Sequence, residues 1–145
     1  YAHEINRRTP LIIWTKNKNV AKKIKLVNNN VMGMYDVMPT LGNMLGFSNP
    51  YALGHDIYDI KEDNVVVFPS GNFVTNTIYY SNTSNNYLIL KENAIIDENY
   101  VSSLKEYADK ILTVSNNIIV HDLIKKEGTN IRSGNSNIGN GDGNG

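Results

Sequence analysis

The stretch from Asn64 to Ile96 constrains the fold most, because it alternates short apolar runs with clusters of turn-forming residues. The runs have the length and the β-branched and aromatic content of strands; they are Val65–Phe68, Asn72–Thr75, Thr77–Tyr80 and Tyr87–Leu90. The connections PSGN (69–72) and NTSNN (82–86) are typical of β-hairpins. The sequence therefore predicts a small antiparallel meander.

A helix is predicted just upstream, in MGMYDVMPTLGNMLGF (32–47). Asp36 has the character of an N-cap whose carboxylate accepts from the first turn, and Pro39 falls where a missing N–H costs little. Gly46 is a typical residue for ending a helix. The helix from Val37 to Gly46 is expected to bury one apolar face, made of Val37, Leu41, Met44 and Leu45.

A second, longer helix is expected after Asp97, which can act as its N-cap. Its apolar residues keep near-helical spacing and are Val101, Leu104, Tyr107, Ala108, Ile111, Leu112 and Ile119, with Ser115 among them. The pattern can extend through IIVHDLIKK before Gly128. From Asn130 onward the sequence is rich in Gly and Asn and is expected to be disordered.

The run LIIWT (11–15) is continuous, apolar and of strand length. It predicts a strand buried on both faces, as in sheets covered by helices, and IKLV (24–27) predicts a half-exposed strand. Because LIIWT requires sheet neighbours on both sides, the isolated chain is expected to be poorly stable. The chain starts with Tyr1 in place of Met, so a fragment or a processed product is expected.

Composition limits the functions that the chain can have. The net charge is zero and the basic stretch KNKNVAKKIK (16–25) is short, which favours a solvated edge over a nucleic-acid site. No apolar run approaches the ~20 residues of a membrane span. The absence of Cys excludes disulfides, thiolate metal sites and a Cys nucleophile, and it fits a cytosolic protein and a bacterial surface protein equally well.

Candidate chemical groups are few and scattered. His3, His55 and His121 lie on separate predicted elements without the short spacing of a zinc site. Asp56, next to His55, is expected to bond its own backbone in a polar loop. Arg7 and Arg8 precede a predicted strand and could meet an anionic ligand, although solvated arginines are the simpler reading.

Three further motifs are better explained by structure than by chemistry. Ser70 in PSGN lacks the frame of a nucleophile elbow and is expected to be a turn serine. NTS (82–84) fits the glycosylation frame and is expected to be a hairpin tip. GNGDGNG (139–145) has the glycine content of a phosphate loop, but no strand, helix or Lys accompanies it.

Two motif-rich stretches resemble the C-terminal portion of lipoteichoic acid synthases, which belong to the sulfatase branch of the alkaline phosphatase superfamily. They are MGMYDVMPTLGNMLGF and ALGHDIYDIKEDNVVVFPSGNFVTNTIYYS. The D-V-M-P-T-L element is Asp36 to Leu41, the G-x-D-aliphatic turn is Gly54 to Ile57, and the strand pair is Val66 to Thr75. RRTPLIIW (7–14) resembles the family's central-sheet strand that follows its metal-binding Asp-His motif. Asn72 stands where these synthases carry an acidic residue.

The resemblance covers about residues 5–125 and implies an α/β fold of the alkaline-phosphatase type. It implies a sulfatase-like part at 1–60, a small sheet-plus-helix subdomain at 61–127 and a tail at 128–145. It further implies that a divalent metal, usually Mn²⁺, and a threonine nucleophile lie upstream of Tyr1, so no residue here is assigned a catalytic, cofactor-binding or metal-binding role. Asp36 is assigned a structural one.

The implied reaction moves glycerol phosphate from phosphatidylglycerol to a growing glycerol-phosphate polymer and releases diacylglycerol. The implied place is the extracellular face of the cell membrane, with the anchor in an N-terminal region and no nucleic-acid partner. Two alternatives stay open. One is a sulfate or phosphate ester hydrolase of the same fold, and the other is a non-catalytic module that binds envelope polymer through Arg7, Arg8 and the lysine stretch.

Overall fold

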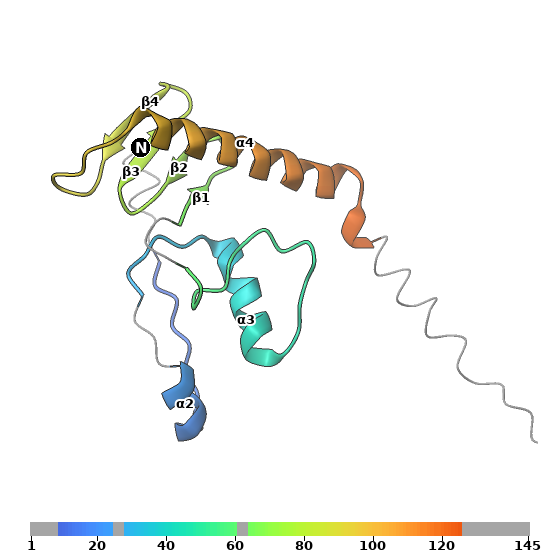
Figure 1. Cartoon of the computed structure of the whole chain (residues 1–145). Coiled ribbons are helices and arrows are strands. Elements are labelled where there is room, and N and C mark those ends of the chain that lie inside the picture. Colours follow the sequence, from blue (N-terminus) through green and yellow to red (C-terminus); the bar gives the residue numbers. More distant parts are fainter. Residues whose placement is uncertain (1–8, 25–27, 61–63, 126–145) are drawn as a thin grey trace, which may run out of the picture.

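The computed structural model describes residues 9–24, 28–60 and 64–125. In chain order the elements are helix α2 (Lys18–Ile24), the 3₁₀ helix η1 (Met34–Asp36), helix α3 (Val37–Leu45), strands β1 (Val66–Val67), β2 (Phe73–Val74), β3 (Ile78–Ser81) and β4 (Asn86–Ile89), and helix α4 (Glu98–Val120). Figure 1 shows the sheet and α4 at one end of the molecule and α2 at the other, with α3 between them. The combination of helices with an antiparallel sheet confirms the predicted α/β class.

The four strands form one sheet in the order β1-β2-β3-β4, and every neighbouring pair is antiparallel. The predicted meander is therefore confirmed. In the first hairpin the Ser70 hydroxyl accepts from the Asn72 N–H, as expected for a turn serine. The β3–β4 hairpin places Asn82–Asn85 in its turn, where Asn85 adopts a left-handed φ of 49°. The predicted tip at NTS is thus confirmed as well.

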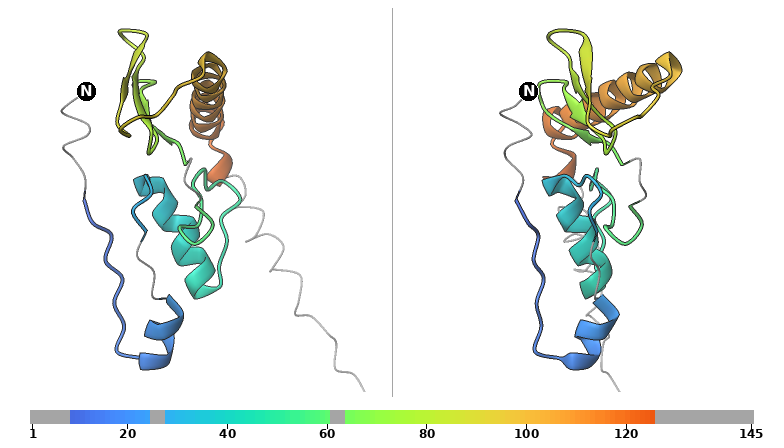
Figure 2. Two further views of the ribbon diagram at one scale, coloured as in Figure 1. Left: turned by 60° about the vertical axis from the view of Figure 1, so that its left-hand side comes forward. Right: turned by 90° about the vertical axis from the view of Figure 1, so that its left-hand side faces the viewer.

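Helix α4 lies across one face of this sheet, and the main core forms between them (Figure 2). The helix begins at the expected N-cap, where the Asp97 carboxylate accepts from the Asn99 N–H. The buried core residues are Val67, Phe73, Ile78, Tyr80, Leu104 and Ala108. Within this core the rings of Phe73 and Tyr80 stack with centroids 4.7 Å apart. None of the described helices, α4 included, is long and apolar enough to cross a bilayer.

The prediction of a buried strand at LIIWT is wrong. Residues 11–15 have no regular secondary structure, and the exposed fractions of Leu11, Ile12 and Trp14 are 45%, 81% and 74%. A strand exists only where a neighbouring strand takes up its backbone N–H and C=O groups. Within the described part of the chain, the one sheet lies elsewhere and leaves this apolar segment unpaired.

The half-exposed strand predicted at IKLV is also wrong, since Ile24 is the last residue of α2, while Lys25–Val27 lie outside the described residues. The helix forms because Asn17 caps it. The Asn17 Oδ1 accepts from the N–H groups of Asn19 and Val20 at 3.0 and 3.2 Å. Local capping therefore outweighs the two-residue alternation on which the strand prediction depended.

Helix α3 is present as predicted and ends at Gly46, which adopts a left-handed φ of 78°. Its predicted buried face is wrong in part. The residues that are buried are Thr40 and Gly42, whereas Leu45 is 71% exposed. The helix thus turns a polar and a small residue inward and leaves part of its apolar surface uncovered. The predicted tail from Asn130 and the Gly128 boundary lie outside the described residues.

Candidate functional site

The Asp36 carboxylate is the most deeply buried charged group in the described chain, with 1% of its surface exposed. Its Oδ2 accepts from the Gly33 N–H at 2.7 Å, and its Oδ1 accepts from the His55 N–H at 2.8 Å. Both donors are backbone N–H groups. Gly33 is three residues from Asp36 in the sequence, and His55 is 19 residues away. Asp36 therefore joins the η1 turn to the loop that contains Gly54.

This arrangement corrects the predicted capping role of Asp36. It stands at the N-cap position of α3, but its side chain makes no capping hydrogen bond to that helix. Asp36 has a structural role, as expected, but its hydrogen-bond partners are not the N–H groups of α3 that an N-cap would bind. The bond from the Gly33 N–H is local and belongs to the start of η1, whereas the bond from the His55 N–H, 19 residues away, fixes tertiary structure.

Thr40 continues the same connection one helical turn later. Its hydroxyl donates to the Asp36 carbonyl at 2.7 Å and accepts from the Ile57 N–H at 3.0 Å. The side chain is fully buried. Since Asp36 holds His55 and Thr40 holds Ile57, the first turn of α3 binds two backbone groups of the same loop.

Gly54 allows this loop to approach η1 closely. A Cβ atom built on Gly54 would lie 2.2 Å from the Tyr35 carbonyl oxygen and 2.8 Å from the Asp36 Cα. No side chain fits at such distances, so a residue without Cβ is required here. The two motifs that carry the family resemblance, D-V-M-P-T-L and G-H-D-I, are thus the two halves of one packed junction. We call Gly33, Asp36, Thr40 and residues 54–57 the Asp36 junction.

Tyr35 links the Asp36 junction to the sheet. Its phenol oxygen accepts from the Val67 N–H at 2.9 Å and donates to the Val65 carbonyl at 3.3 Å. Burial raises the pKa of Tyr35 to about 12; the Val67 hydrogen bond acts in the opposite direction, and the charges of Asp36 and Tyr107 add to the rise. Burial first, and then Asp36, likewise raises the pKa of Tyr107 on α4.

His55 and Asp56 do not form a catalytic pair. The His55 side chain is half exposed, with Nδ1 at 3.9 Å from the Asp36 Oδ1. Asp56 accepts from the Tyr58 N–H at 3.1 Å, as expected for a loop carboxylate that bonds its own backbone, and also from the Asn43 amide. His121 is remote from both, at the C-cap of α4.

The described residues contain no group of three His, Cys, Asp or Glu side chains that could hold a metal ion. His3, Arg7 and Arg8 lie outside the described residues. The assignment of catalysis and metal binding to polypeptide upstream of Tyr1 stays a prediction.

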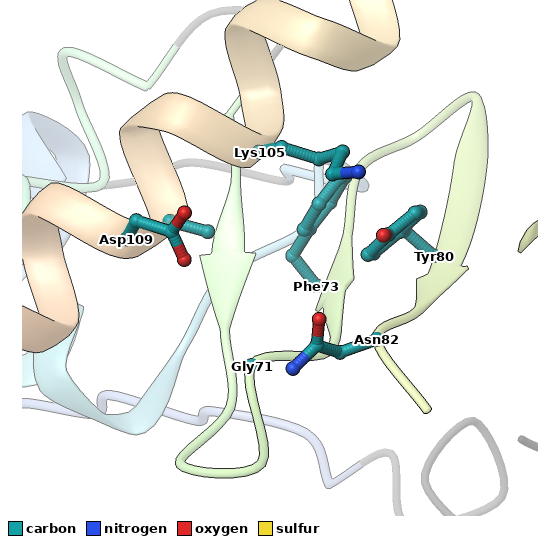
Figure 3. A pocket seen from close by; sticks show the side chains of 7 residues that line it. Gly71, Phe73, Tyr80, Asn82, Lys105 and Asp109 are labelled. Carbon is teal, nitrogen blue, oxygen red and sulfur yellow. The ribbon is translucent and has the colours of Figure 1, made fainter. Parts of the chain in front are cut away.

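A small pocket lies where α4 crosses the turns of the sheet (Figure 3). Its volume of about 30 Å³ is enough for a water molecule and too small for an organic substrate. Its one ammonium group is engaged, because the Lys105 Nζ donates to the Asn85 Oδ1 at 2.9 Å and lies 5.4 Å from the centroid of the Tyr80 ring. These contacts anchor the β3–β4 hairpin to α4. We assign the pocket no ligand.

Sequence reasoning identified Asp36 and the G-x-D turn, but it missed Thr40 and Tyr35 as members of the same unit. A signal for Thr40 exists in the sequence, since a hydroxyl residue four positions after Asp36 lies one helical turn away on the same face. No local signal marks Tyr35, because its partners are the backbone of a strand about thirty residues downstream.

Comparison with known proteins finds similarity to lipoteichoic acid synthases. The chain is 31% identical over 106 residues to lipoteichoic acid synthases of Staphylococcus aureus, including those of strains USA300, NCTC 8325 / PS 47 and N315. The match covers 68% of this chain, and the chain spans only 16% of the length of these synthases. No family model matches the chain, and no solved structure gives a significant match. The similarity therefore concerns one segment of a much longer enzyme.

Proposed function

We propose that this chain forms the C-terminal part of the catalytic domain of an enzyme of the lipoteichoic acid synthase type. The similarity to these synthases over 106 residues carries the proposal. The Asp36 junction supports it, because the stretches that resemble the family form one hydrogen-bonded unit. In this proposal the chain contributes support for an active site and no reacting group.

Uncovered apolar surface supports the same proposal. Ile12 and Trp14 are 81% and 74% exposed, and on the η1–α3 segment Met34, Met38 and Leu45 are 79%, 49% and 71% exposed. Met38 and Leu45 are seven residues apart, on one face of α3, and Met34 precedes them in η1. Surface of this kind normally packs against another chain or domain. We assign it to contact with the remainder of the catalytic domain, with α3 as a covering helix.

The proposed reaction is the transfer of glycerol phosphate from phosphatidylglycerol to a growing polymer on the extracellular face of the membrane. A divalent metal such as Mn²⁺ would lower the pKa of the nucleophile and offset the charge on the phosphoryl oxygens. The described residues do not fit such an ion, so we derive no step through it. What this chain supplies is a rigid junction, in which Asp36 and Thr40 hold the loop at 54–57 against η1.

The proposal can be tested with a chimera. The homologous segment of the Staphylococcus aureus synthase is replaced by this chain, and Mn²⁺-dependent release of diacylglycerol from phosphatidylglycerol is measured. We expect activity in the chimera and its loss in the variant Gly54→Ala, in which the loop at 54–57 cannot pack against η1. The exposed substitution Asn116→Ala on α4 serves as the control that leaves activity unchanged.

Other outcomes would redirect the proposal. A folded chimera that releases no diacylglycerol would reject it. Cleavage of a generic sulfate ester, without release of diacylglycerol, by the natural full-length protein would favour the hydrolase alternative. The upstream reading frame is the simplest check, since a Thr-containing metal motif and an Asp-His pair support the enzyme, whereas a signal peptide directly ahead of Tyr1 supports the non-catalytic polymer-binding module.

A further inference from the structure

Helix α2 carries a basic face that the proposed enzymatic role does not use. At about 100° per residue, Lys18, Lys22 and Lys23 fall on one half of the helix and Val20, Ala21 and Ile24 on the other. All three lysines are exposed, while Ala21 and Ile24 are half-buried. The helix therefore turns its apolar side toward the molecule and its ammonium groups toward the solvent.

Carboxylates of the described residues do not compensate these charges. Among the described residues, no carboxylate lies within ion-pair distance of any lysine of α2. Lys18 and Lys22 are spaced i, i+4, and the first turn of the helix has no acidic residue. Like charges at this spacing repel each other, and so do a lysine and the positive end of the helix dipole. An anionic partner would relieve both effects.

The wider sequence has the same asymmetry. Residues 5–35 contain seven basic residues and no acidic one, whereas residues 36–145 contain seven basic and thirteen acidic ones. A neutral chain thus has a strongly positive N-terminal part and a negative remainder. Such a charge distribution orients the molecule toward an anionic surface, with α2 directed at it.

The position of α2 identifies the kind of surface. The helix lies at the end of the molecule that is farthest from the sheet and α4 (Figures 1 and 2). A basic helix that projects from one end of the molecule can present its three lysines to a flat anionic surface. We propose that the basic face of α2 docks onto an anionic lipid bilayer. This inference goes beyond the proposed enzymatic function and does not depend on it.

The docking is electrostatic and does not insert the helix. Val20, 41% exposed, is the one residue of α2 with a large exposed apolar side chain, and it lies opposite the lysines. Binding therefore depends on the anionic lipid fraction and weakens with salt. The Debye length falls from about 10 Å at 0.1 M salt to about 3 Å at 1 M, which removes most of the attraction.

The test is co-sedimentation of the full chain with phosphatidylcholine vesicles that contain or lack phosphatidylglycerol. The variant K22Q/K23Q is compared with K91Q/K110Q, which removes the same net charge from exposed sites far from α2. We expect roughly 30-fold weaker partitioning for K22Q/K23Q, the loss that two lysines near an anionic surface produce, and little change for the control. Circular dichroism of each variant establishes that the fold is kept.

Each other outcome overturns the inference. Absence of binding to vesicles with phosphatidylglycerol would refute it, and so would binding that persists at 1 M salt. An equal loss in the two double variants would show that net charge, and not the face of α2, determines binding. Binding to soluble poly(glycerol phosphate) but not to the vesicles would assign the lysines to a polymer. The enzymatic proposal survives every one of these results, because it is tested by release of diacylglycerol.

Discussion

At the scale of single residues, the structure explains the family-like motifs as hydrogen-bonding and packing requirements. The Asp36 carboxylate and the Thr40 hydroxyl hold the N–H groups of His55 and Ile57, and Gly54 leaves room for this contact. The helix and the glycine turn could be recognised from sequence. Their contact could not, because it depends on the course of the chain between residues 46 and 54.

Thr40→Val tests the hydroxyl of the Asp36 junction. The substitution keeps the side-chain shape and removes both hydrogen bonds of a fully buried group. We expect a loss of about 1–3 kcal/mol in the free energy of unfolding, measured by urea denaturation, because the Ile57 N–H is left without its acceptor. Thr113→Val, on the exposed side of α4, is the matched control. A loss of the same size in both variants would contradict the role of the junction.

Gly54→Ala and Gly46→Ala separate two reasons for a glycine. At Gly46 the space is open and only the left-handed φ is unfavourable, so a loss of about 1 kcal/mol is expected. At Gly54 the added methyl meets backbone atoms that cannot move aside, so a loss of about 3 kcal/mol or more is expected. Thermal and urea unfolding of the two variants measure which loss of stability is larger. A larger loss for Gly46→Ala would show that the Asp36 junction is loosely packed.

The Tyr35 phenol predicts a decrease in stability at alkaline pH. Its pKa is raised from 10.0 to about 12 in the folded state, so between these values the unfolded chain releases a proton that the folded chain keeps. Unfolding is therefore favoured progressively as the pH rises from about 10 to about 12, while below pH 10 the contribution of Tyr35 is constant. Urea titrations across this range measure the slope. Tyr35→Phe should reduce the slope, and an unchanged slope in this variant would assign it to other groups.

At the scale of elements, the meander, α3 and α4 were correctly predicted from local patterns. The strand at IKLV, predicted from a local alternation, and the strand at LIIWT, which needed neighbouring strands, were both wrong. The hairpins are defined by their own turn residues, and α4 by its Asp97 cap and its apolar stripe. LIIWT has the composition of a buried strand, but pairing is a non-local property, and the described chain offers no strand beside it. The buried face of α3 was also mispredicted because it depends on a non-local contact. Thr40 is buried where it accepts a hydrogen bond from Ile57 in a distant loop.

Leu104→Ala tests the packing of α4 on the sheet. Leu104 is 9% exposed and belongs to the core that contains Phe73 and Ile78. Truncation of a buried leucine leaves a cavity, so we expect a loss of about 2–5 kcal/mol in the free energy of unfolding. Val114→Ala on the same helix removes an apolar group that is 45% exposed, and it should cost much less. Comparable losses would mean that the core extends farther along α4.

At the scale of the whole molecule, the described chain has a well-packed half and an uncovered half. The sheet and α4 share a continuous core, whereas residues 11–15 and one side of α3 expose large apolar groups. The exposed apolar groups are a physical reason to expect that the isolated chain is poorly stable. A melting experiment would test this expectation. The contrast between the two halves also implies that the same mutation can have different effects in the isolated chain and in the chimera with the synthase.

Leu45→Ala makes this contrast measurable. In the isolated chain Leu45 is 71% exposed, so its truncation should change the free energy of unfolding by less than about 0.5 kcal/mol. In the chimera with the synthase the same side chain is expected to be covered, and the loss should rise to about 2 kcal/mol or more. Denaturation of both proteins gives the comparison. A negligible effect in both would argue that α3 does not face the remainder of the catalytic domain.

The hydrogen bonds of Tyr35 have a consequence for how the sheet of this chain can be extended. Its phenol occupies the outward-facing N–H of Val67 and C=O of Val65, which an additional strand beside β1 would need. On the opposite margin the Asn86 side chain takes the Tyr87 N–H in the same manner. The border at β1 is therefore occupied by Tyr35 of η1, whereas at the β4 border one outward-facing N–H, that of Tyr87, is occupied. A further strand can therefore be added beside β1 only if Tyr35 releases the Val67 N–H and the Val65 C=O.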